Sequence, residues 1–204
     1  MMKRLVDIVV ASIAILLLSP IFLFVAYKVR KHLGSPIFFC QERPGKDGKI
    51  FKMIKFRSMK NALDQQGNLL PDEQRITPFG QKLRATTLDE MPQLFNVLKG
   101  DMSIVGPRPQ MPEFLEHYTP NQMRRHEVKP GMTGLAQVSG RNNLSWEEKF
   151  DLDVQYVENR NILLDFKIMV KTVDVMLKRE GVNAPDQAVG ASRFTGSQSN
   201  SIVK

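Results

Sequence analysis

The sequence predicts a mostly helical α+β protein that is monotopic, meaning that it enters a membrane and leaves by the same face. Three patterns predict this: an apolar N-terminal stretch interrupted by Ser-Pro, a strand–loop–strand pattern after it, and amphipathic helical periodicity near the C-terminus. We expect a re-entrant membrane helix over 1–33, a core with amphipathic C-terminal helices over 34–180, and a flexible tail over 181–204, functioning as one domain.

The composition fits one domain with a membrane anchor. The 204 residues are 42% hydrophobic, which is enough for a packed core. The net charge of +8 favours anionic partners such as nucleic acid, phosphorylated small molecules or an anionic phospholipid bilayer. The single cysteine, Cys40, excludes an intramolecular disulfide, and three scattered histidines form no zinc-type cluster.

The apolar stretch runs from Leu5 to Val29, and its only charged residues are Asp7 and, next to its end, Lys28. As a straight helix it would be roughly 37 Å long, and the hydrocarbon core of a bilayer is roughly 30 Å thick. The apolar run continues past any plausible cleavage site, which disfavours a cleaved signal peptide. A simple transmembrane anchor remains an alternative.

Two features favour a re-entrant helix over a transmembrane anchor. The pair Ser19-Pro20 lies in the middle of the stretch, where proline removes a backbone hydrogen bond and kinks the helix. Positive charge marks the cytoplasmic side of a membrane segment. Basic residues flank this stretch on both sides: Lys3, Arg4, Lys28, Arg30 and Lys31.

The next segment predicts a β-hairpin followed by a polar excursion. Apolar runs at 37–39 and 50–54 flank a Gly-containing loop. Lys55 and Arg57 alternate with apolar residues, so they form either the solvated face of an edge strand or a phosphate-binding pair. The polar stretch from Asn61 is either a surface excursion or a mobile lid.

A helix is predicted before Lys99 and Gly100, which are suitable helix-stop residues. Its start is open between Thr87 and Pro92. Thr87 and Glu90 fit a capping box, in which each side chain bonds a free N–H group at a helix start. The apolar residues at near-helical spacing are Leu83, Leu88, Met91, Leu94, Phe95 and Leu98.

Two loops carry candidate anion-binding groups. Arg108 lies between two prolines, which stiffen the backbone around it, and its guanidinium suits phosphate oxygens. A Pro-rich turn with a solvated arginine is the alternative. The second loop combines glycines and basic residues that could cradle a phosphate or nucleotide: Lys129, Gly131, Gly134, Gly140 and Arg141.

The C-terminal part predicts helices. Ser145 and Glu148 fit a capping box at the first of them. The second half is either a helix on a soluble core or an interfacial helix with a lysine-rich rim. Its expected apolar face contains Ile162, Phe166, Met169, Val170, Val173 and Leu177. The opposite face contains Lys167, Lys171, Asp174 and Lys178.

Taken together, several segments strongly resemble the bacterial sugar transferase family, the monotopic phosphoglycosyl transferases. They are the basic start with its apolar Ser-Pro segment, "KFRSM", "LDEMPQLFNVLKGDMSIVGPRP", "KPGMTGLAQVSGR" and "FDLDVQYVENRNILLDFKIM". The resemblance covers Lys3 to Glu180 and implies a minimal catalytic core without the additional transmembrane helices of larger members.

The resemblance implies transfer of sugar-1-phosphate from a UDP-sugar to undecaprenyl phosphate, with release of UMP, at the cytoplasmic face of the bacterial inner membrane. It implies that Asp89 is the nucleophile and touches a Mg²⁺ cofactor, with Glu90 as the second member of a dyad. It implies no nucleic-acid partner, and it is compatible with a homodimer. The phosphate- and substrate-binding residues it implies are Arg108, Arg84, Lys55 and, for the nucleotide, Arg141.

The chain departs from the family pattern at Leu135, where many members have Trp, and at Asn161, where many have Ser. The compact core and the tail "RFTG" resemble the members that begin bacterial N-glycosylation with UDP-di-N-acetylbacillosamine. UDP-N-acetylgalactosamine, UDP-galactose and UDP-glucose are the alternative donors, for an O-antigen, capsule or exopolysaccharide. Rival classes are a non-catalytic membrane scaffold and a basic nucleic-acid-binding protein.

Overall fold

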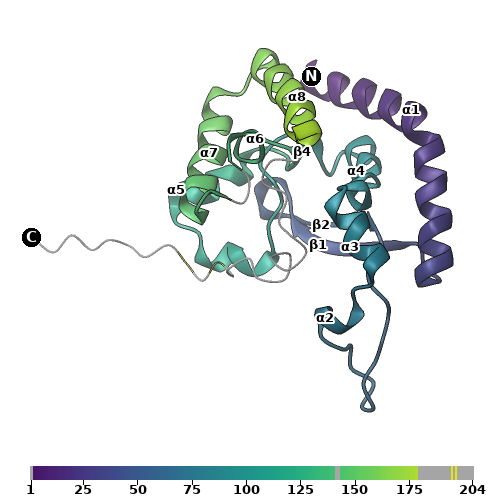
Figure 1. The fold of residues 1–204 in the computed structure, drawn as a ribbon. Coiled ribbons are helices and arrows are strands. Elements are labelled where there is room, and N and C mark those ends of the chain that lie inside the picture. The colour runs from purple at the N-terminus through teal and green to yellow at the C-terminus, as the bar shows by residue number, and fades with distance from the viewer. Residues whose placement is uncertain (1, 141–142, 179–193, 195, 197–204) are drawn as a thin grey trace, which may run out of the picture. The chain divides into compact units, whose positions relative to one another are not determined.

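The computed structural model describes residues 2–140, 143–178, 194 and 196 (Figure 1). The chain divides into two compact units that alternate along the sequence. Among the described residues, unit 1 contains 2–41 and 52–100, and unit 2 contains the others. Helices predominate over two small two-stranded sheets, so the predicted mostly helical α+β class is confirmed. The predicted domain boundaries stay predictions.

Unit 1 begins with the long helix α1, Met2–Leu33, which contains Pro20. Figure 1 shows α1 as two arms that meet at a sharp bend. Proline cannot donate the backbone hydrogen bond of a helix interior, which accounts for a kink. The Ser19 hydroxyl donates to the Leu16 carbonyl at 2.8 Å, as Ser and Thr commonly do in bent helices. The predicted proline kink is therefore present.

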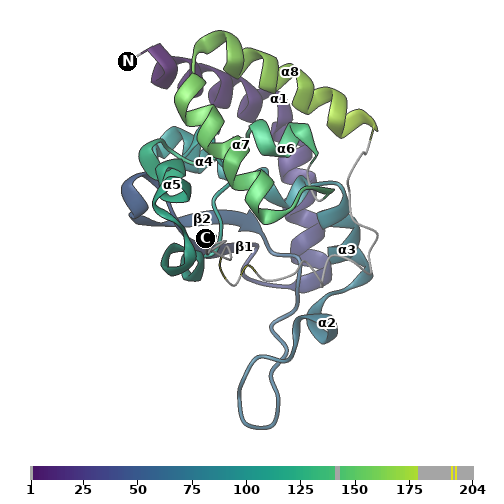
Figure 2. The same cartoon turned by 90° about the vertical axis from the view of Figure 1, so that its left-hand side faces the viewer.

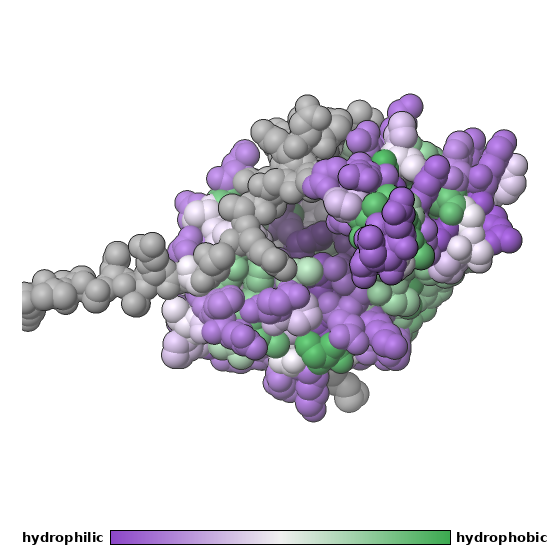
Figure 3. Space-filling model, turned by 90° about the horizontal axis from the view of Figure 1, so that it is seen from below, coloured by the Kyte–Doolittle hydropathy of each residue, from purple (hydrophilic) through white to green (hydrophobic). Residues whose placement is uncertain are grey.

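Most of α1 is exposed and apolar, and the helix is long enough to cross a membrane. Its exposed apolar residues include Leu5, Ile13, Leu16, Leu17, Leu23 and Phe24. Figure 3, by contrast, shows a face of the surface on which hydrophilic residues predominate and hydrophobic ones form small separate groups. An uninterrupted apolar helix surface is unfavourable in water, so α1 indicates a membrane location.

The remaining face of α1 packs in the core of unit 1. Val25 and Val29 are buried against Phe56, Leu83 and Met91. The helix also packs against α4, Gln93–Lys99. One side of α1 therefore belongs to the same core as the segment that follows the acidic pair.

The predicted hairpin is confirmed. Strands β1, Phe38–Pro44, and β2, Ile50–Phe56, are hydrogen-bonded neighbours joined by the short 3₁₀ helix η1, Lys46–Gly48. Its base lies in unit 1 and its tip in unit 2.

Helix α4 is fixed on β2 by one buried amide. The Asn96 side chain donates to the Lys52 carbonyl at 2.8 Å and accepts from the Ile54 N–H at 2.9 Å. These bonds satisfy two backbone groups of β2, so the strand and the helix hold a fixed register.

The polar stretch from Asn61 forms an extended loop with a short helix α2, Asp72–Arg75 (Figure 2). Isolated bridges join Met59 to Ile76 and Leu63 to Leu69. It is a surface excursion, as one of the two interpretations expected. Helix α3, Pro78–Ala85, follows it.

Unit 2 is built on a parallel pair of strands, β3, Ser103–Val105, and β4, Gly131–Thr133. Ser103 pairs with Gly131, and Val105 pairs with Thr133. Besides η1 at the hairpin tip, the short helices of this unit are η3 (Pro112–His117), α5 (Pro120–Met123), η4 (Arg124–Glu127) and α6 (Leu135–Ser139).

Helices α7, Trp146–Asn159, and α8, Ile162–Lys178, follow, and α6 packs against both (Figure 2). The predicted capping box is confirmed, because the Ser145 hydroxyl accepts from the Glu148 N–H at 3.2 Å and the Glu148 carboxylate accepts from the Ser145 N–H at 2.7 Å.

Helix α8 departs from its predicted single apolar face. Ile168 is buried and Met169 packs beside it in the unit 2 core. The other apolar residues of the predicted face whose side chains are described point elsewhere and are exposed: Ile162, Phe166, Val170 and Val173. The helix is thus apolar on two sides, because the same spacing supplies both a core-facing row and an outer row.

A second core of unit 2 is aromatic. Phe114, Phe150 and Phe194 are buried together, with Tyr118 and Trp146 packed against them. Phe194 is one of two described residues of the predicted flexible tail; the others of 181–204 lie outside the described residues. Its ring is 5.0 Å from that of Phe150, in an edge-to-face arrangement that aromatic pairs favour.

Candidate active site

The acidic pair lies on the short 3₁₀ helix η2, Leu88–Glu90, between α3 and α4. The predicted capping box is wrong. Thr87 has a left-handed backbone, with φ of +59°, and its side chain makes no capping bond. A capping residue needs an extended backbone to direct its oxygen at the following N–H groups. Asp89 is buried, at 7% exposure.

Helix α4 begins at Gln93, directly after Pro92, which confirms the later of the two predicted starts. It ends at Lys99, and Gly100 follows with φ of +98°, as the helix-stop prediction expected.

Glu90 pairs with a lysine from the hairpin. Lys55 Nζ lies 2.8 Å from Glu90 Oε1, and the two side chains are 18% and 13% exposed. Lys55 is on β2, so the strand delivers a cation to the residue next to Asp89. An ion pair this poorly solvated is stronger than a surface pair. The structure therefore brings together three predicted site residues, Asp89, Glu90 and Lys55.

Arg84 comes from the last turn of α3, and α3 packs against η2. Its Nε donates to the Ser58 hydroxyl at 2.9 Å. One turn earlier, Gly80 lies against the same residue, and a Cβ there would be 1.8 Å from the Ser58 carbonyl oxygen. Only glycine permits this approach. Gly80 and Ser58 thus set where Arg84 lies.

Arg57 does not fit the phosphate-binding interpretation. It is buried, and its guanidinium donates to the Ser35 carbonyl at 3.0 Å and to the Leu33 carbonyl. Leu33 is the last residue of α1. Arg57 thus holds the C-terminal end of α1, where free carbonyls attract a cation.

Arg108 belongs to unit 2, on the turn that follows β3, and is half-buried. Its flanking prolines are buried, so this is not the solvated turn of the alternative interpretation. Arg141, the predicted nucleotide-binding residue, lies outside the described residues.

The glycines of the second loop have a packing role. A Cβ on Gly131 would lie 2.1 Å from the Gly106 nitrogen, and one on Gly134 would lie 2.3 Å from the Gly106 oxygen. The predicted close backbone approach is confirmed, but what approaches is the chain's own Gly106 segment. These two positions therefore give no support to a phosphate cradle.

Sequence reasoning did not single out Ser58 or a buried pair in unit 2, Arg125 and Asp153. Arg125 Nη2 lies 2.6 Å from Asp153 Oδ2, and both side chains are almost wholly buried. Desolvation lowers the pKa of Arg125, but the charges and hydrogen bonds of Asp153 and Tyr118 together outweigh it, so the pKa is raised and the arginine stays charged. A signal existed: Asp153 lies on the apolar face of its helix, beside Phe150, Val154 and Val157 at helical spacing.

The acidic pair also bears on metal binding. In the part of the chain that the structure describes, no group of three or more His, Cys, Asp or Glu side chains could hold a metal. Magnesium, however, is often bound by one or two carboxylates, with substrate phosphates and water completing its shell. Asp89 beside Glu90 fits a site of that kind.

The arrangement in unit 1 suits attack on a phosphorus atom. Asp89 offers a carboxylate oxygen as nucleophile, and Lys55 and Arg84 are cations on elements that contact or adjoin η2. Cations offset the repulsion between a carboxylate and an anionic phosphate.

Comparison with known proteins gives a consistent result. The family model described as bacterial sugar transferase matches residues 1–179. The chain is 52% identical to "Uncharacterized sugar transferase EpsL" of Bacillus subtilis, over 96% of each chain. It is 40% identical to the undecaprenyl-phosphate galactose phosphotransferase of Salmonella typhimurium, over 88% of this chain and 41% of that protein.

It is 42% identical to the UDP-glucose:undecaprenyl-phosphate glucose-1-phosphate transferase of Klebsiella pneumoniae, over 84% of this chain and 39% of that protein. The chain thus spans about two fifths of the length of these two relatives.

Proposed function

The chain belongs to the bacterial sugar transferase family, and from this membership we propose that it transfers sugar-1-phosphate from a UDP-sugar to undecaprenyl phosphate. The products are undecaprenyl-diphosphate-sugar and UMP. This would be the first membrane step of glycoconjugate assembly. As a member of the family, the chain is an enzyme of sugar-phosphate transfer.

Asp89 acts as the nucleophile in two displacements. In the first, a carboxylate oxygen of Asp89 attacks the phosphorus that carries the sugar, a P–O bond forms, and the bond to UMP breaks. In the second, an oxygen of undecaprenyl phosphate attacks the same phosphorus and Asp89 leaves. A covalent intermediate replaces one difficult step by two easier ones. The burial of Asp89 supports this role, because a desolvated carboxylate interacts more strongly with nearby cations.

Lys55 and Glu90 organise the charge around the nucleophile. Because Glu90 is held on Lys55 at 2.8 Å, the pair contributes little net repulsion toward an incoming diphosphate. We assign Arg84 to the diphosphate, positioned by its bond to Ser58. Arg108 is a second phosphate ligand, because a guanidinium fork matches phosphate oxygens. Arg141 stays the proposed contact to the nucleotide.

Asp89 would hold Mg²⁺ together with the diphosphate of the donor. When bound, the ion would supply charge neutralisation at the phosphate oxygens. Asp89 needs no other carboxylate partner for this, since the substrate itself contributes oxygen ligands.

The attachment of both ends of α1 supports a re-entrant topology. Near its start, Arg4 donates to the Val97 and Leu98 carbonyls in the last turn of α4, at 2.5 and 2.7 Å. Its end at Leu33 is held by Arg57. A helix that crossed the bilayer would place its ends roughly 30 Å apart on opposite faces.

Since unit 1 holds both ends of α1, we propose that both lie on the cytoplasmic face, with the bend in the membrane. A cysteine-accessibility scan tests this in a Cys40→Ser background. Labelling of Lys3→Cys and Lys31→Cys from opposite faces would exclude it.

The exposed outer row of α8 supports an interfacial position for that helix. Phe166, Val170 and Val173 are each more than half exposed. Lys167 and Lys171 are exposed beside them, and lysine is attracted to anionic phospholipid. An acceptor with its tail in lipid and its phosphate at the surface requires an enzyme that lies at the same level.

The donor is a UDP-sugar, and two observations point to different sugars. The tail "RFTG" favours UDP-di-N-acetylbacillosamine. The names of two relatives contain galactose and UDP-glucose. A donor panel should therefore contain the bacillosamine derivative, N-acetylgalactosamine, galactose and glucose as UDP-sugars.

The observation that carries the proposal is the buried Asp89 beside the Lys55–Glu90 pair, in a chain matched by the family model over residues 1–179. The test is UMP release from that panel with undecaprenyl phosphate and Mg²⁺. We expect Asp89→Asn to lower release at least roughly a thousandfold, because removing a covalent nucleophile has effects of this size or larger. Asp151→Asn, an exposed acid on α7, is the matched control. Unchanged release in Asp89→Asn would exclude the mechanism.

A further inference from the structure

Hydrogen bonds hold the backbone at the end of β3 and in the turn that follows it. The Tyr156 hydroxyl lies 3.1 Å from the Val105 carbonyl oxygen, and the Gly106 N–H donates to Thr133 at 2.9 Å. The Pro107 carbonyl accepts from Gly131 at 2.9 Å. Three consecutive residues before Arg108 are therefore fixed by hydrogen bonds.

The carbonyl of Arg108 itself is held by another arginine. Arg125 Nη2 donates to the Arg108 oxygen at 2.7 Å. The same guanidinium donates to Asp153 through Nε and Nη2, at 3.0 and 2.6 Å, and to the Tyr118 hydroxyl at 3.1 Å. The guanidinium carbon also lies 5.4 Å from the centre of the Phe150 ring. The Arg125 guanidinium is thus held by hydrogen bonds to three partners and by contact with an aromatic ring.

These contacts remove the backbone freedom of Arg108. The residue before a proline is confined to extended conformations, and Pro109 follows Arg108. With Pro107 fixed on one side and its own carbonyl held on the other, the backbone of Arg108 is held in one conformation. Groups fixed before a ligand arrives lose less entropy on binding it.

Stability alone does not account for a buried arginine here. A buried ion pair is often no more stabilising than apolar residues of the same volume, because desolvating both charges is costly. The distinctive feature of Arg125 is that its planar fork reaches the carboxylate, the hydroxyl and the Arg108 carbonyl at once, which no apolar residue and no lysine can do.

We propose that Arg125 is a positioning residue: anchored by Asp153 and Tyr118, it fixes the Arg108 backbone so that the Arg108 side chain is pre-oriented for the phosphates of the donor. This inference rests on the proposed function, since it takes Arg108 as a phosphate ligand. It concerns how that ligand is held.

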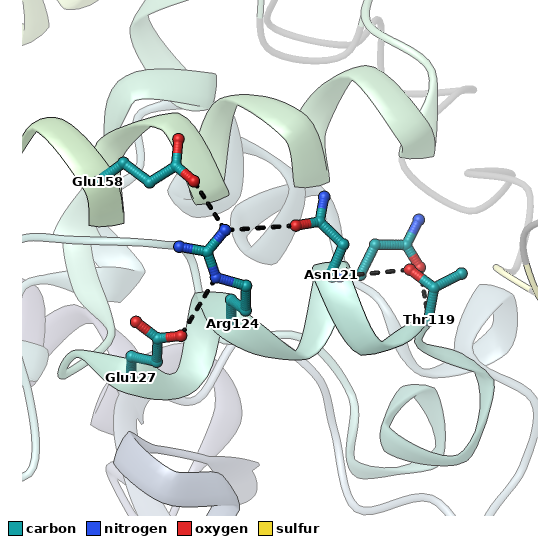
Figure 4. Close-up of polar contacts among 6 residues, drawn as sticks. Thr119, Asn121, Arg124, Glu127 and Glu158 are labelled. Atoms are coloured by element: carbon teal, nitrogen blue, oxygen red, sulfur yellow. Dashed lines mark hydrogen bonds and ion pairs between the residues drawn. The ribbon is translucent and has the colours of Figure 1, made fainter.

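The chain offers a matched control in the preceding residue. Arg124 is also an arginine of η4 and is ion-paired, but its partners are Glu127 and Glu158 at 3.3 and 2.7 Å, and its side chain is 39% exposed. Figure 4 shows Arg124 among Glu127, Glu158 and Asn121. The two positions therefore differ in burial and in contact with Arg108.

The test is a double-mutant cycle on kcat/KM for UMP release. We expect Arg125→Lys to lower kcat/KM about tenfold, the size of effect that loss of a charged hydrogen bond produces. In an Arg108→Ala background the same substitution should cost nothing further, because a residue that acts through Arg108 has nothing left to position. Arg124→Lys should stay within about twofold of the starting protein.

A full effect of Arg125→Lys in the Arg108→Ala background, or wild-type kcat/KM in Arg125→Lys, would overturn the inference. If Arg125→Lys does not fold, Tyr118→Phe removes one hydroxyl from the same network and should show the same dependence on Arg108 with a smaller loss, about threefold.

Failure of the proposed function is recognised separately. It is shown by UMP release that survives Asp89→Asn. In that case the affinity of the same single and double variants for UDP is measured by calorimetry, which needs no turnover. Non-additive losses of UDP affinity support the positioning role, whereas additive losses, or a protein that binds no UDP, overturn it.

Discussion

The two units of the molecule hold their charged groups in different ways. In unit 1, Lys55 and Glu90 share one short contact and remain partly exposed, and Arg84 has one described bond to Ser58. In unit 2, Arg125 and Asp153 are almost wholly buried, and the arginine has three hydrogen-bonding partners. The Lys55–Glu90 pair thus keeps its charges within reach of an anionic substrate, whereas Arg125 fixes the backbone of unit 2, as the buried Arg57 does at the end of α1 in unit 1.

This difference follows from what each group must do. A charge that binds and releases phosphate must exchange partners during a cycle, so it cannot be saturated by the protein. A buried charge must be saturated, because an unpaired one in the interior is strongly destabilising. Substitutions at the buried Arg125–Asp153 pair should therefore lower stability strongly. Substitutions at the Lys55–Glu90 pair should lower stability less but lower activity strongly.

The largest stability effect is expected from breaking the buried pair. Asp153→Ala leaves Arg125 charged and desolvated, so the free energy of unfolding should fall by about 3–5 kcal/mol. Trp146 is the single tryptophan and lies in the aromatic core of unit 2, so its fluorescence in detergent reports the unfolding of that unit. Asp151→Ala, an exposed acid on the same helix, should change the free energy by less than about 0.5 kcal/mol. Equal effects of the two substitutions would remove the distinction between the units.

The second effect concerns His126, which lies beside Arg125 and within 3.0 Å (Nδ1 to O) of the Gly45 carbonyl. Burial, and then the charge of Arg125, lower its pKa to about 4, against the smaller opposing effect of the Gly45 bond. The folded state therefore favours the neutral ring.

The consequence is a loss of stability in acid. Above about pH 6.5 the ring is neutral in both the folded and unfolded states, and stability is unaffected. As the pH falls from 6.5 toward 4, only the unfolded chain takes up the proton, so unit 2 should lose about 3 kcal/mol. Unfolding followed by Trp146 fluorescence between pH 8 and 4 measures this loss, and His126→Gln should flatten the profile. An unchanged profile in that variant would show that another group is responsible.

The third effect returns to unit 1. In Gly80→Ala the new methyl group would lie 1.8 Å from the Ser58 carbonyl oxygen, so α3 must shift. We expect a loss of about 1–3 kcal/mol, typical of overpacking, and a reduced rate of UMP release, because Arg84 moves with the helix. Gln81→Ala, an exposed neighbour on α3, should change neither. Normal activity in Gly80→Ala would show that Arg84 need not lie where Ser58 holds it.

Local signals in the sequence predicted the local structure well. The proline kink in α1, the hairpin, the Gly100 helix stop and the Ser145 capping box each depend on a few adjacent residues. The Thr87 capping box failed although its sequence pattern is equally good. Glu90 bonds Lys55, a residue 35 positions away, and no local pattern reveals that contact.

The same limit applies to the arginines. The alternation of Arg57 with apolar residues left a solvated strand face and a phosphate-binding role both open, yet Arg57 is buried and binds the end of α1, 24 residues earlier. Arg124 and Arg125 are adjacent and chemically identical, yet their partners differ: Arg124 pairs with Glu158 at the exposed end of α7, and Arg125 pairs with the buried Asp153. The sequence thus identified candidate residues, and the long-range contacts assigned them different tasks.

The smallest stability effect is expected at the Lys55–Glu90 pair. Lys55→Gln should lower the free energy of unfolding by only about 1 kcal/mol. The two side chains are 18% and 13% exposed, so water can solvate Glu90 once Lys55 is replaced, which is not possible at the fully buried Arg125–Asp153 pair. UMP release should nevertheless fall roughly tenfold or more, because the charge beside Asp89 is lost. Lys52→Gln, an exposed lysine on the same strand, is the control. A stability loss as large as that of Asp153→Ala would show that Lys55 has a structural role. The Lys55–Glu90 pair and the Arg125–Asp153 pair would then not differ in the way proposed.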